Sequence, residues 1–404
     1  MKNIFVNGIY SFIIIGLLFS CGPKTKKLIK LPTEVGFTTT GNWIFIKLKI
    51  NKTDDLNFMI DNGVDETVMN KRTAEQLGYK FNKRGTYTGA FGRDSVYYSE
   101  NNKIFIGNLE LDSIKLVQVP LENLEQTFGV SIDGIIGEAL FKKYIVNIDL
   151  EKKRIQLYTD KNDFIQKDSL FSIDLKIISK VPVIQASFIL NNTDTLYGNL
   201  MVDLGYRNSV ALNTPFVKKN NLISKLDKYY TFNATGIIAA EKSYMARLKI
   251  FKLGDYTMDS ITYMVNQSNT GNLTTIDYDG IVGMEVLTRF ASVGFDYKNK
   301  KMYLGKYNYI KDNIYSDVNC SGLELKKISS TSKVIVNAVY KNSPASEVGL
   351  KEGDELTLIK GQDVKKYELT EVKKILREKG KTIDILIKRG NKNMNFKLNL
   401  RELI

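Results

Sequence analysis

The chain contains an internal repeat, which limits the folds open to it more than any other feature of its sequence. Three motifs occur twice in the same order: an apolar segment that ends in Asp-x-Gly, an Asp-Gly-Ile-x-Gly segment, and an aspartate before a lysine-containing turn. The copies are residues 58–63 and 199–205, residues 133–137 and 279–283, and residues 148–153 and 295–300. The second copy follows at nearly constant offsets of 142 to 147 residues (61 to 203, 133 to 279, 149 to 296). We therefore expect two copies of one unit of about 145 residues.

Each copy is predicted to consist mainly of β-strands. Residues 43–50, 103–109 and 247–254 have strand-like composition, and clusters of Asn, Asp and Gly separate such segments. One short helix is expected after each Ile-x-Gly turn, over residues 138–141 and 284–287. The predicted fold class is therefore mainly β, with a β-barrel-like unit used twice.

The composition excludes several kinds of active site. The 404 residues include no histidine and two cysteines, which rules out His-containing triads, Cys-His pairs and His-ligated or Cys₄ metal sites. General acid–base chemistry must then come from Asp, Glu, Lys or Tyr, and we expect neither a metal nor a cofactor. The net charge is +14, but the lysines are spread along the whole chain. We therefore predict a solvated basic surface and no nucleic-acid partner.

The first residues are expected to be a targeting signal outside the fold. Lys2 precedes an apolar stretch over residues 9–19, which has signal-peptide length and is short for a membrane-spanning helix. The sequence Leu18-Phe19-Ser20-Cys21 resembles a bacterial lipobox. This resemblance implies an exported protein that is anchored to a bacterial membrane, expected to be the outer membrane, by lipid on Cys21. An ordinary secretory signal with an incidental cysteine is the alternative.

The repeated Asp-x-Gly turns indicate acid–base chemistry. A single Asp-x-Gly is usually a β-turn, but here an apolar strand precedes both copies, and an Ile-x-Gly turn follows each one later in the chain. Glycine permits a turn that holds the aspartate at the mouth of its β unit. If the two units face each other, Asp61 and Asp203 meet and share one proton. Such a pair can activate a water molecule and protonate a peptide carbonyl without a metal, a histidine or a covalent intermediate.

Residues 60–68 resemble the active-site segment of the retropepsins, and residues 134–137 resemble the second motif of that fold. With both repeats on one chain, residues from about 34 to 310 are similar to a bilobal, retropepsin-like aspartic protease. The resemblance implies an aspartic-type endopeptidase that acts on a peptide or protein substrate, with Asp61 and Asp203 as its catalytic dyad. It also implies flap hairpins around residues 89–92 and 235–236. The residues that it assigns to substrate binding are Asn62, Gly63, Asp65, Gly89 and Gly205.

Several residues depart from the retropepsin pattern. Asn62 and Leu204 stand where a Thr or Ser follows each aspartate, and Tyr206 stands where a small residue is usual. Arg207 follows Asp203 closely and is expected to lower the pKa of that aspartate. These departures leave a second hypothesis open, in which the protein is a catalytically inactive relative that binds peptides as a scaffold.

The C-terminal part of the chain has a different pattern. Residues 342–356 run from a Ser-Pro-Ala helix start, through Gly349 as the left-handed end of this helix, to a Gly-Asp turn. Residues 369–379 have helical apolar spacing. Together with alternating strands, this pattern resembles a bacterial PDZ domain of α+β class.

The PDZ resemblance implies that a peptide C-terminus adds as a strand beside the first strand of the domain, with its carboxylate held by backbone N–H groups. The residues assigned to this peptide are Gly322, Leu323, Glu324 and Leu325. Alternatively, the domain packs on the lobes and binds nothing. The predicted segments are a signal peptide (1–20), a lipidated cysteine with a tether (21–33), two protease-like lobes (34–166 and 167–310), a linker (311–319) and the PDZ domain (320–404).

Overall fold

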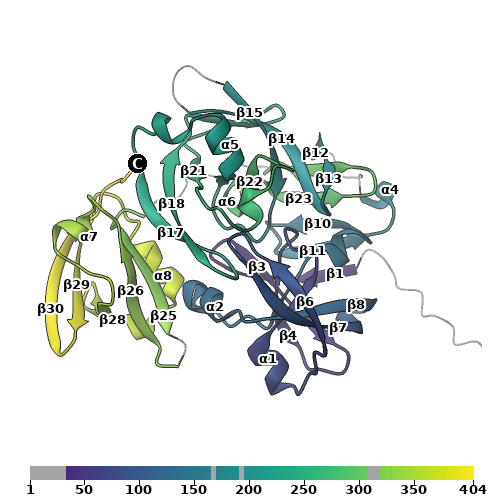
Figure 1. Cartoon of the computed structure of the whole chain (residues 1–404), viewed down its shortest axis with the longest axis horizontal. Helices are drawn as coiled ribbons and strands as arrows, with labels where there is room; N and C mark the ends of the chain where they lie inside the picture. Colours follow the sequence, from purple (N-terminus) through teal and green to yellow (C-terminus); the bar gives the residue numbers. More distant parts are fainter. Residues whose placement is uncertain (1–32, 165–169, 191–194, 308–318, 329) are drawn as a thin grey trace, which may run out of the picture.

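The computed structural model describes residues 33–164, 170–190, 195–307, 319–328 and 330–404. The predicted signal peptide with Cys21, nearly all of the predicted tether and linker, and the boundary between residues 166 and 167 lie outside these ranges. Within them, no helix has the length and apolar character needed to cross a membrane. The protein is mainly β, as predicted, and its strands form four sheets (Figure 1).

The first half of the chain forms an eight-stranded sheet, which we call lobe 1. Its strands are β2 (Thr38–Thr40), β3 (Trp43–Ile50), β4 (Leu56–Ile60), β5 (Thr67–Asn70), β6 (Lys83–Thr88), β7 (Arg93–Ile106), β8 (Leu109–Val119) and β9 (Gly134–Ile136). They lie in the order β2-β3-β4-β9-β5-β8-β7-β6, and a further pairing between β3 and β7 joins distant parts of the sheet. Three helices belong to this lobe: α1 (Lys71–Gln76), α2 (Glu122–Phe128) and α3 (Glu138–Phe141).

The second half forms a ten-stranded sheet, which we call lobe 2. Its strands are β13 (Lys176–Ile178), β14 (Val181–Ile189), β15 (Thr195–Val202), β16 (Val210–Leu212), β17 (Tyr230–Thr235), β18 (Ala240–Arg247), β19 (Ile250–Leu253), β20 (Tyr256–Asp259), β21 (Thr262–Val265) and β22 (Gly280–Val282). Their order is β17-β18-β21-β16-β22-β15-β14-β19-β20, with β13 beside β14. The helices are α5 (Thr214–Lys219), α6 (Met284–Leu287) and the 3-10 turns η1 (Ile223–Lys225) and η2 (Asn272–Thr274).

A six-stranded sheet joins the two lobes. Its strands are β1 (Thr33–Gly36), β10 (Ile145–Asp149), β11 (Arg154–Tyr158), β12 (Leu170–Asp174), β23 (Ser292–Asp296) and β24 (Lys301–Gly305). The order β1-β11-β10-β23-β24-β12 places equivalent strands of the two copies side by side, because β10 pairs antiparallel with β23. The short helix α4 (Lys161–Phe164) follows β11. One apolar core runs through both lobes and this sheet, so the duplicated units fold as one body.

The Asp-Gly-Ile-x-Gly motif lies where strands of each lobe approach most closely. β4 pairs in parallel with β9, and β15 pairs in the same way with β22. A Cβ atom at Gly134 or Gly280 would lie 2.3 Å from a backbone carbonyl oxygen of the neighbouring strand, so only glycine fits at either position. Asp133 and Asp279 each accept a 2.8 Å hydrogen bond from a backbone N–H of the same lobe. The repeated motif therefore has a structural purpose in both copies.

The C-terminal domain has its own sheet and its own apolar core. Its elements are β25 (Leu323–Ile328), β26 (Lys333–Val339), α7 (Pro344–Glu347), β27 (Glu355–Ile359), β28 (Gln362–Asp363), η3 (Val364–Lys366), α8 (Leu369–Ile375), β29 (Thr382–Arg389) and β30 (Lys392–Asn399). The strand order is β25-β26-β27-β29-β30, with β28 beside β27, so β25 is an edge strand. Ser343 caps α7, Pro344 opens it, and Gly349 has a φ of +82°, in agreement with the sequence pattern.

Three predicted elements have different bounds in the structure. Residues 103–109 are not one strand, because β7 ends at Ile106 and β8 begins at Leu109 after a turn in which Gly107 has a φ of +58°. Residues 247–254 likewise contain the end of β18 and all of β19. The helix predicted over residues 369–379 ends at Ile375. The sequence did not reveal these ends, because residues of similar composition lie on both sides of each one.

The C-terminal domain packs against both lobes, with β25 and α8 on the side that faces them (Figure 1). Helix α2 of lobe 1 contacts β25, and the carbonyl oxygen of Thr127 at its end accepts a 2.7 Å hydrogen bond from Lys373 of α8. On the side of lobe 2, the rings of Tyr230 and Tyr340 stack with their centroids 4.8 Å apart. Glu402 pairs with Arg247 of lobe 2 at 3.4 Å.

Candidate active site

The two repeated aspartates occupy equivalent turns at the ends of β4 and β15. Asp61 directly follows β4, and its Oδ1 atom accepts a 2.8 Å hydrogen bond from the N–H of Gly63. Asp203 directly follows β15, and its Oδ1 atom accepts a 2.7 Å hydrogen bond from the N–H of Gly205. The backbone N–H of Tyr206 donates a second bond to Asp203 at 3.1 Å. Each turn thus fixes its carboxyl group through its own backbone.

The structure brings the two carboxyl groups together, each against the glycine of the opposite lobe. A Cβ atom at Gly205 would lie 2.2 Å from Oδ2 of Asp61. A Cβ atom at Gly63 would lie 3.0 Å from Cγ and from Oδ1 of Asp203. Glycine is therefore required at residue 205 to let the opposite carboxyl group approach the turn.

Burial and proximity keep this pair from ionising as two independent acids. Burial raises the pKa of Asp61 well above its usual value, and the charge of Asp203 raises it further. Burial also raises the pKa of Asp203, against the hydrogen bonds from Asp61, Gly205 and Tyr206, which lower it. Two carboxyl groups this close cannot both ionise freely, so the pair can hold one shared proton.

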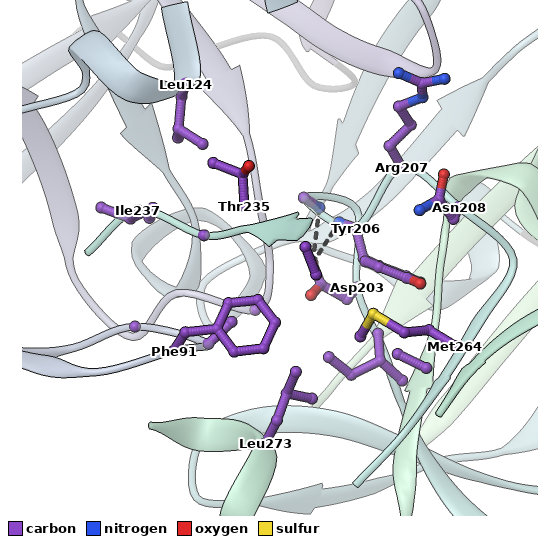
Figure 2. Close-up of a pocket in the computed structure, with 18 of the residues that line it drawn as sticks. Phe91, Leu124, Asp203, Tyr206, Arg207, Asn208, Thr235, Ile237, Met264 and Leu273 are labelled. Carbon is purple, nitrogen blue, oxygen red and sulfur yellow. Dashed lines mark hydrogen bonds between the residues drawn. The ribbon is translucent and has the colours of Figure 1, made fainter. Parts of the chain in front are cut away.

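The expectation that Arg207 lowers the pKa of Asp203 is wrong, because the pKa of Asp203 is raised and its causes do not include Arg207. The guanidinium group points away from Asp203 (Figure 2) and lies 5.6 Å from the ring centroid of Trp43. Tyr206 also turns away from Asp203, and its hydroxyl group donates to the carbonyl oxygen of Val210 at 3.3 Å. Neither side chain fills the space between the aspartates.

Two side chains of lobe 1 hold the aspartate turn of lobe 2. Oδ1 of Asn62 accepts a 2.8 Å hydrogen bond from the backbone N–H of Leu204. The indole N–H of Trp43 donates to the carbonyl oxygen of Gly205 at 2.9 Å. We interpreted Trp43 from the sequence as a core residue, and it is indeed 5% exposed, but it also positions this turn. No local sequence signal distinguished it from other buried aromatic residues.

Two hairpin tips meet above the aspartates. The tip between β6 and β7 contains Gly89, whose N–H donates to the carbonyl oxygen of Gly92 at 3.1 Å. The tip between β17 and β18 closes in the same way through Gly236 and Ala239, at 2.8 Å. A Cβ atom at Gly89 or Gly92 would come within 3.2 Å of the Ile238 side chain, so the tips are in contact. The hairpins occupy the segments where flaps are expected.

A cavity of about 610 Å³ contains both aspartates and extends from the hairpins to the C-terminal domain. Gly63, Gly89 and Gly205 line it, as does Asp65, which forms a long ion pair with Lys180 at 3.8 Å. Its wall also carries Phe91, Met264 and Leu273 (Figure 2). In the described part of the chain, no cluster of Cys, Asp and Glu side chains is placed to hold a metal ion.

The first strand of the C-terminal domain borders the same cavity. Leu323, Glu324 and Leu325 line its wall. The N–H of Gly322 donates to Oδ1 of Asn319 at 2.9 Å, and the N–H of Leu323 donates to a serine hydroxyl at 3.0 Å. These two groups are therefore engaged within their own loop. That they hold a peptide carboxylate stays a prediction, which requires the loop to give up these bonds.

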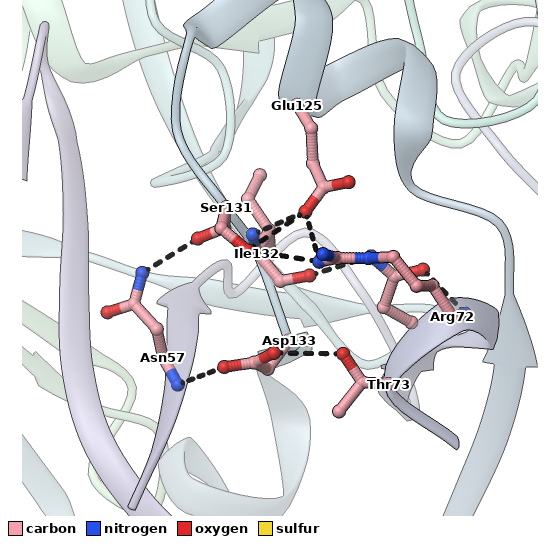
Figure 3. A network of polar contacts seen from close by, with 8 residues as sticks. Asn57, Arg72, Thr73, Glu125, Ser131, Ile132 and Asp133 are labelled. Carbon is pink, nitrogen blue, oxygen red and sulfur yellow. Dashed lines mark hydrogen bonds and ion pairs between the residues drawn. The ribbon is translucent and has the colours of Figure 1, made fainter. Parts of the chain in front are cut away.

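A polar network fixes helix α2 between lobe 1 and the C-terminal domain (Figure 3). Glu125 of α2 is buried, and its Oε1 atom accepts bonds from Arg72 at 2.7 Å and from the N–H of Ile132 at 2.8 Å. Asp133 continues the network by accepting a 2.8 Å bond from the Thr73 hydroxyl. The network anchors one end of the cavity wall, because Leu124, Thr127 and Phe128 of α2 line the cavity.

Comparison with known proteins supports both predicted parts of the chain. Residues 46–139 match the model of an aspartyl protease family, and residues 316–388 match that of the PDZ domain. Among solved structures, a retropepsin-like aspartic protease from Rickettsia conorii is similar at 20% identity over 34% of this chain and 90% of that chain, with a TM-score of 0.25. The HtrA-type protease AlgW with a decapeptide is similar at 10% identity over 77% and 83% of the two chains, with a TM-score of 0.21. No curated protein matches.

These matches confirm the predicted aspartyl-protease-like segment and the C-terminal PDZ domain. Asp61 lies within the first matched segment and Asp203 lies outside it. The pairing of Asp203 with Asp61 therefore rests on the internal repeat and on the geometry of the two turns.

Proposed function

We propose that the protein is an aspartic-type endopeptidase, in which Asp61 and Asp203 activate a water molecule for peptide-bond hydrolysis. The observation that carries this proposal is that duplicated turns bring two carboxyl groups together in one cavity, Asp61 buried and Asp203 half-buried, each against the glycine of the opposite turn. The aspartyl protease match over residues 46–139 supports it. The proposed substrate is a peptide segment, because the cavity is long and is bounded by two hairpins and an edge strand.

In the proposed reaction, the ionised Asp203 takes a proton from water as the oxygen of this water attacks the peptide carbonyl carbon. The protonated Asp61 donates its proton to the carbonyl oxygen, which yields a neutral tetrahedral diol. As the diol collapses and the C–N bond breaks, Asp203 gives the proton that it took from water to the leaving nitrogen. Asp61 takes a proton from one diol hydroxyl group as the new carbonyl forms, so the pair is again singly protonated, with the proton on Asp61. Gly63, Gly205 and Asn62 hold the two turns in place, while Asp65 and the hairpin that contains Gly89 lie where they can contact the substrate backbone.

The proposal also includes peptide binding at the PDZ domain through the strand that begins at Leu323, and membrane anchoring through lipid on Cys21. The PDZ match supports the first, and the lipobox-like sequence supports the second. Incorporation of a labelled fatty acid into the full chain, and its loss in Cys21→Ser, tests the anchor.

A cleavage assay tests the enzyme. The full chain in detergent is incubated with unfolded casein from acidic to neutral pH, with and without pepstatin. We expect cleavage that falls by about 10²–10⁴-fold in Asp61→Asn and in Asp203→Asn. Asp277→Asn is the matched control, because Asp277 lies on the same cavity wall, is exposed, and accepts a hydrogen bond from Ser179 rather than from the turns. Undiminished cleavage in either dyad variant would falsify the assignment.

The competing function is that of a peptide-binding scaffold. The side chain of Leu204 favours it, because this side chain cannot form a hydrogen bond across the lobes equivalent to that of Asn62. Absence of cleavage at every pH, with peptide binding retained, would identify the protein as such a scaffold.

A further inference from the structure

The charged groups on the cavity wall are unevenly distributed. Six carboxyl-bearing residues line it: Asp61, Asp65, Glu66, Asp203, Asp277 and Glu324. Among the described lining residues, three carry a positive charge: Arg207, Lys373 and Arg377. Lobe 2 supplies the first of these, and the PDZ domain supplies the other two from α8 and the turn after it. We call these three residues the basic cluster.

The basic cluster breaks the symmetry of the two lobes. Arg207 follows Asp203 by four residues, as Asp65 follows Asp61, so equivalent positions carry opposite charges. The Arg207 guanidinium group lies 5.6 Å from the ring centroid of Trp43, and Arg207 lines the same cavity as Lys373 and Arg377. Lys373 and Arg377 are four residues apart, and the N–H of Arg377 still bonds to the carbonyl oxygen of Lys374, so one helical face presents both cations.

The members of the basic cluster are half-buried, and their like charges repel each other. Burial, together with the charges of Arg207 and Arg377, lowers the pKa of Lys373 to about 7, whereas the charge of Glu324 raises it. Burial likewise lowers the pKa of Arg207 to about 10, with Arg377 acting in the same direction. Glu324 is the facing carboxylate, and it also accepts a 3.3 Å bond from Asn337. Lys373 donates a hydrogen bond to the backbone carbonyl oxygen of Thr127, which carries no charge.

Positive charges that converge on a cavity from two domains are the arrangement that binds an anion. Guanidinium groups suit a carboxylate in particular, because their planar donors match its two oxygens. The backbone N–H groups of Gly322 and Leu323 donate within their own loop, so the basic cluster is a separate source of donors at this end of the cavity.

We infer that Arg207, Lys373 and Arg377 form a subsite for a carboxylate of the bound peptide, at the junction of lobe 2 and the PDZ domain. This inference rests on the proposed function in one respect, namely that the cavity receives a peptide. The carboxylate is either the peptide C-terminus or an acidic side chain, since both offer the same chemistry. Its binding fixes the direction of the peptide and its position relative to the aspartates.

Binding measurements on the full-length Asp61→Asn variant in detergent test this subsite without a requirement for cleavage. The probes are three fluorescein-labelled apolar octapeptides: one with a free C-terminus, one with a C-terminal amide, and the amide with glutamate as its last residue. We expect the free acid, the glutamate peptide, or both to bind about tenfold more tightly than the plain amide. The peptide that binds more tightly than the plain amide shows whether the carboxylate comes from the C-terminus or from a side chain.

Lys373→Met should remove most of this preference, measured as the ratio of the two affinities in the same variant. Lys374→Met is the matched control, because Lys374 is the next residue on α8, is exposed, and is not part of the cavity wall. Equal binding of all three peptides overturns the inference, and so does the absence of binding by any of them. A preference for the acid that Lys373→Met leaves intact overturns it as well.

The inference and the proposed enzyme can fail separately. If the variant prefers carboxylates but the wild-type chain cleaves nothing, the subsite stands and the hydrolase proposal falls. If the wild-type chain cleaves all three peptides with equal kcat/KM, the hydrolase proposal stands and the subsite falls.

Discussion

Oδ1 of Asn62 in lobe 1 accepts a 2.8 Å hydrogen bond from the backbone N–H of Leu204 in lobe 2. This contact joins the residues that directly follow the two aspartates, so it ties one turn to the other. The Leu204 side chain forms no equivalent hydrogen bond toward lobe 1, because it has no polar atom. The indole N–H of Trp43 provides a second tie, to Gly205. The alignment of the two aspartates therefore depends on hydrogen bonds from lobe 1 side chains to the aspartate turn of lobe 2.

Loss of the Asn62 side chain should destabilise the protein. Asn62→Ala leaves the buried N–H of Leu204 without its partner, which costs about 1–3 kcal/mol in the free energy of unfolding. Urea denaturation of the two proteins measures this cost. Asn62→Ser is the comparison, because it keeps a short polar side chain, and it should lose less. Equal midpoints for the wild type and Asn62→Ala would show that the contact contributes nothing.

The two glycines of the aspartate turns should differ in their tolerance of a methyl group. A Cβ atom at Gly205 would lie 2.2 Å from Oδ2 of Asp61, whereas one at Gly63 would lie 3.0 Å from the Asp203 carboxyl group. Gly205→Ala must displace Asp61, so we expect at least a 100-fold loss of kcat/KM with casein. Gly63→Ala should retain more activity. The reverse order of activities would contradict the arrangement of the pair described above.

The pH dependence of stability should reveal the raised pKa values of the aspartates. Native Asp61 and Asp203 keep a proton at pH values where the unfolded chain, with a carboxyl pKa of about 3.9, has released it. The wild type therefore loses stability as the pH rises above that value. Asp61→Asn removes one of these groups, so its Tm relative to the wild type should be higher at pH 7 than at pH 4. Asp277→Asn should show no such change. A constant difference in Tm for Asp61→Asn would argue against shared protonation.

The preference for a peptide carboxylate should weaken as the pH rises through the titration of Lys373. Its pKa of about 7 makes Lys373 cationic at pH 6 and neutral at pH 9. The facing charges are Arg207, whose pKa of about 10 keeps it cationic over most of this range, Arg377 and Glu324. We expect the acid-to-amide affinity ratio of the Asp61→Asn variant to fall from about tenfold at pH 6 to a few-fold at pH 9. Peptide anisotropy titrations measure it, and a ratio that rises over this range would exclude a role for Lys373.

Much of this fold could be predicted because the repeat and the glycine motifs carry strong local constraints. Gly134 and Gly280 mark strand contacts that exclude every other residue, and Gly349 ends α7 in the left-handed region. Strand ends inside long apolar stretches could not be predicted, as at Gly107, because both sides of the turn have strand composition. The site shows the same division. Asp61 and Asp203 stood out as a repeated pair, whereas the contact of Arg207 with Trp43 joins residues more than 160 positions apart in the chain.

The cluster at the PDZ domain could not be predicted for a related reason. Lys373 and Arg377 look like ordinary solvated helix residues in the sequence, and only the docking of α8 beside α2 and lobe 2 brings them to the cavity. Interdomain contacts of this kind have no local pattern in a single sequence. They depend on how separately folded surfaces fit together.

The pairing of β10 with β23 has a kinetic consequence. The two halves are joined by adjacent strands of one continuous sheet. The two carboxyl groups therefore come together within a single molecule, and no association of two molecules is needed. Dilution should therefore leave the turnover per molecule unchanged. A few copies of the protein would be as competent, molecule for molecule, as many copies, and the amount of product would depend on the supply of substrate.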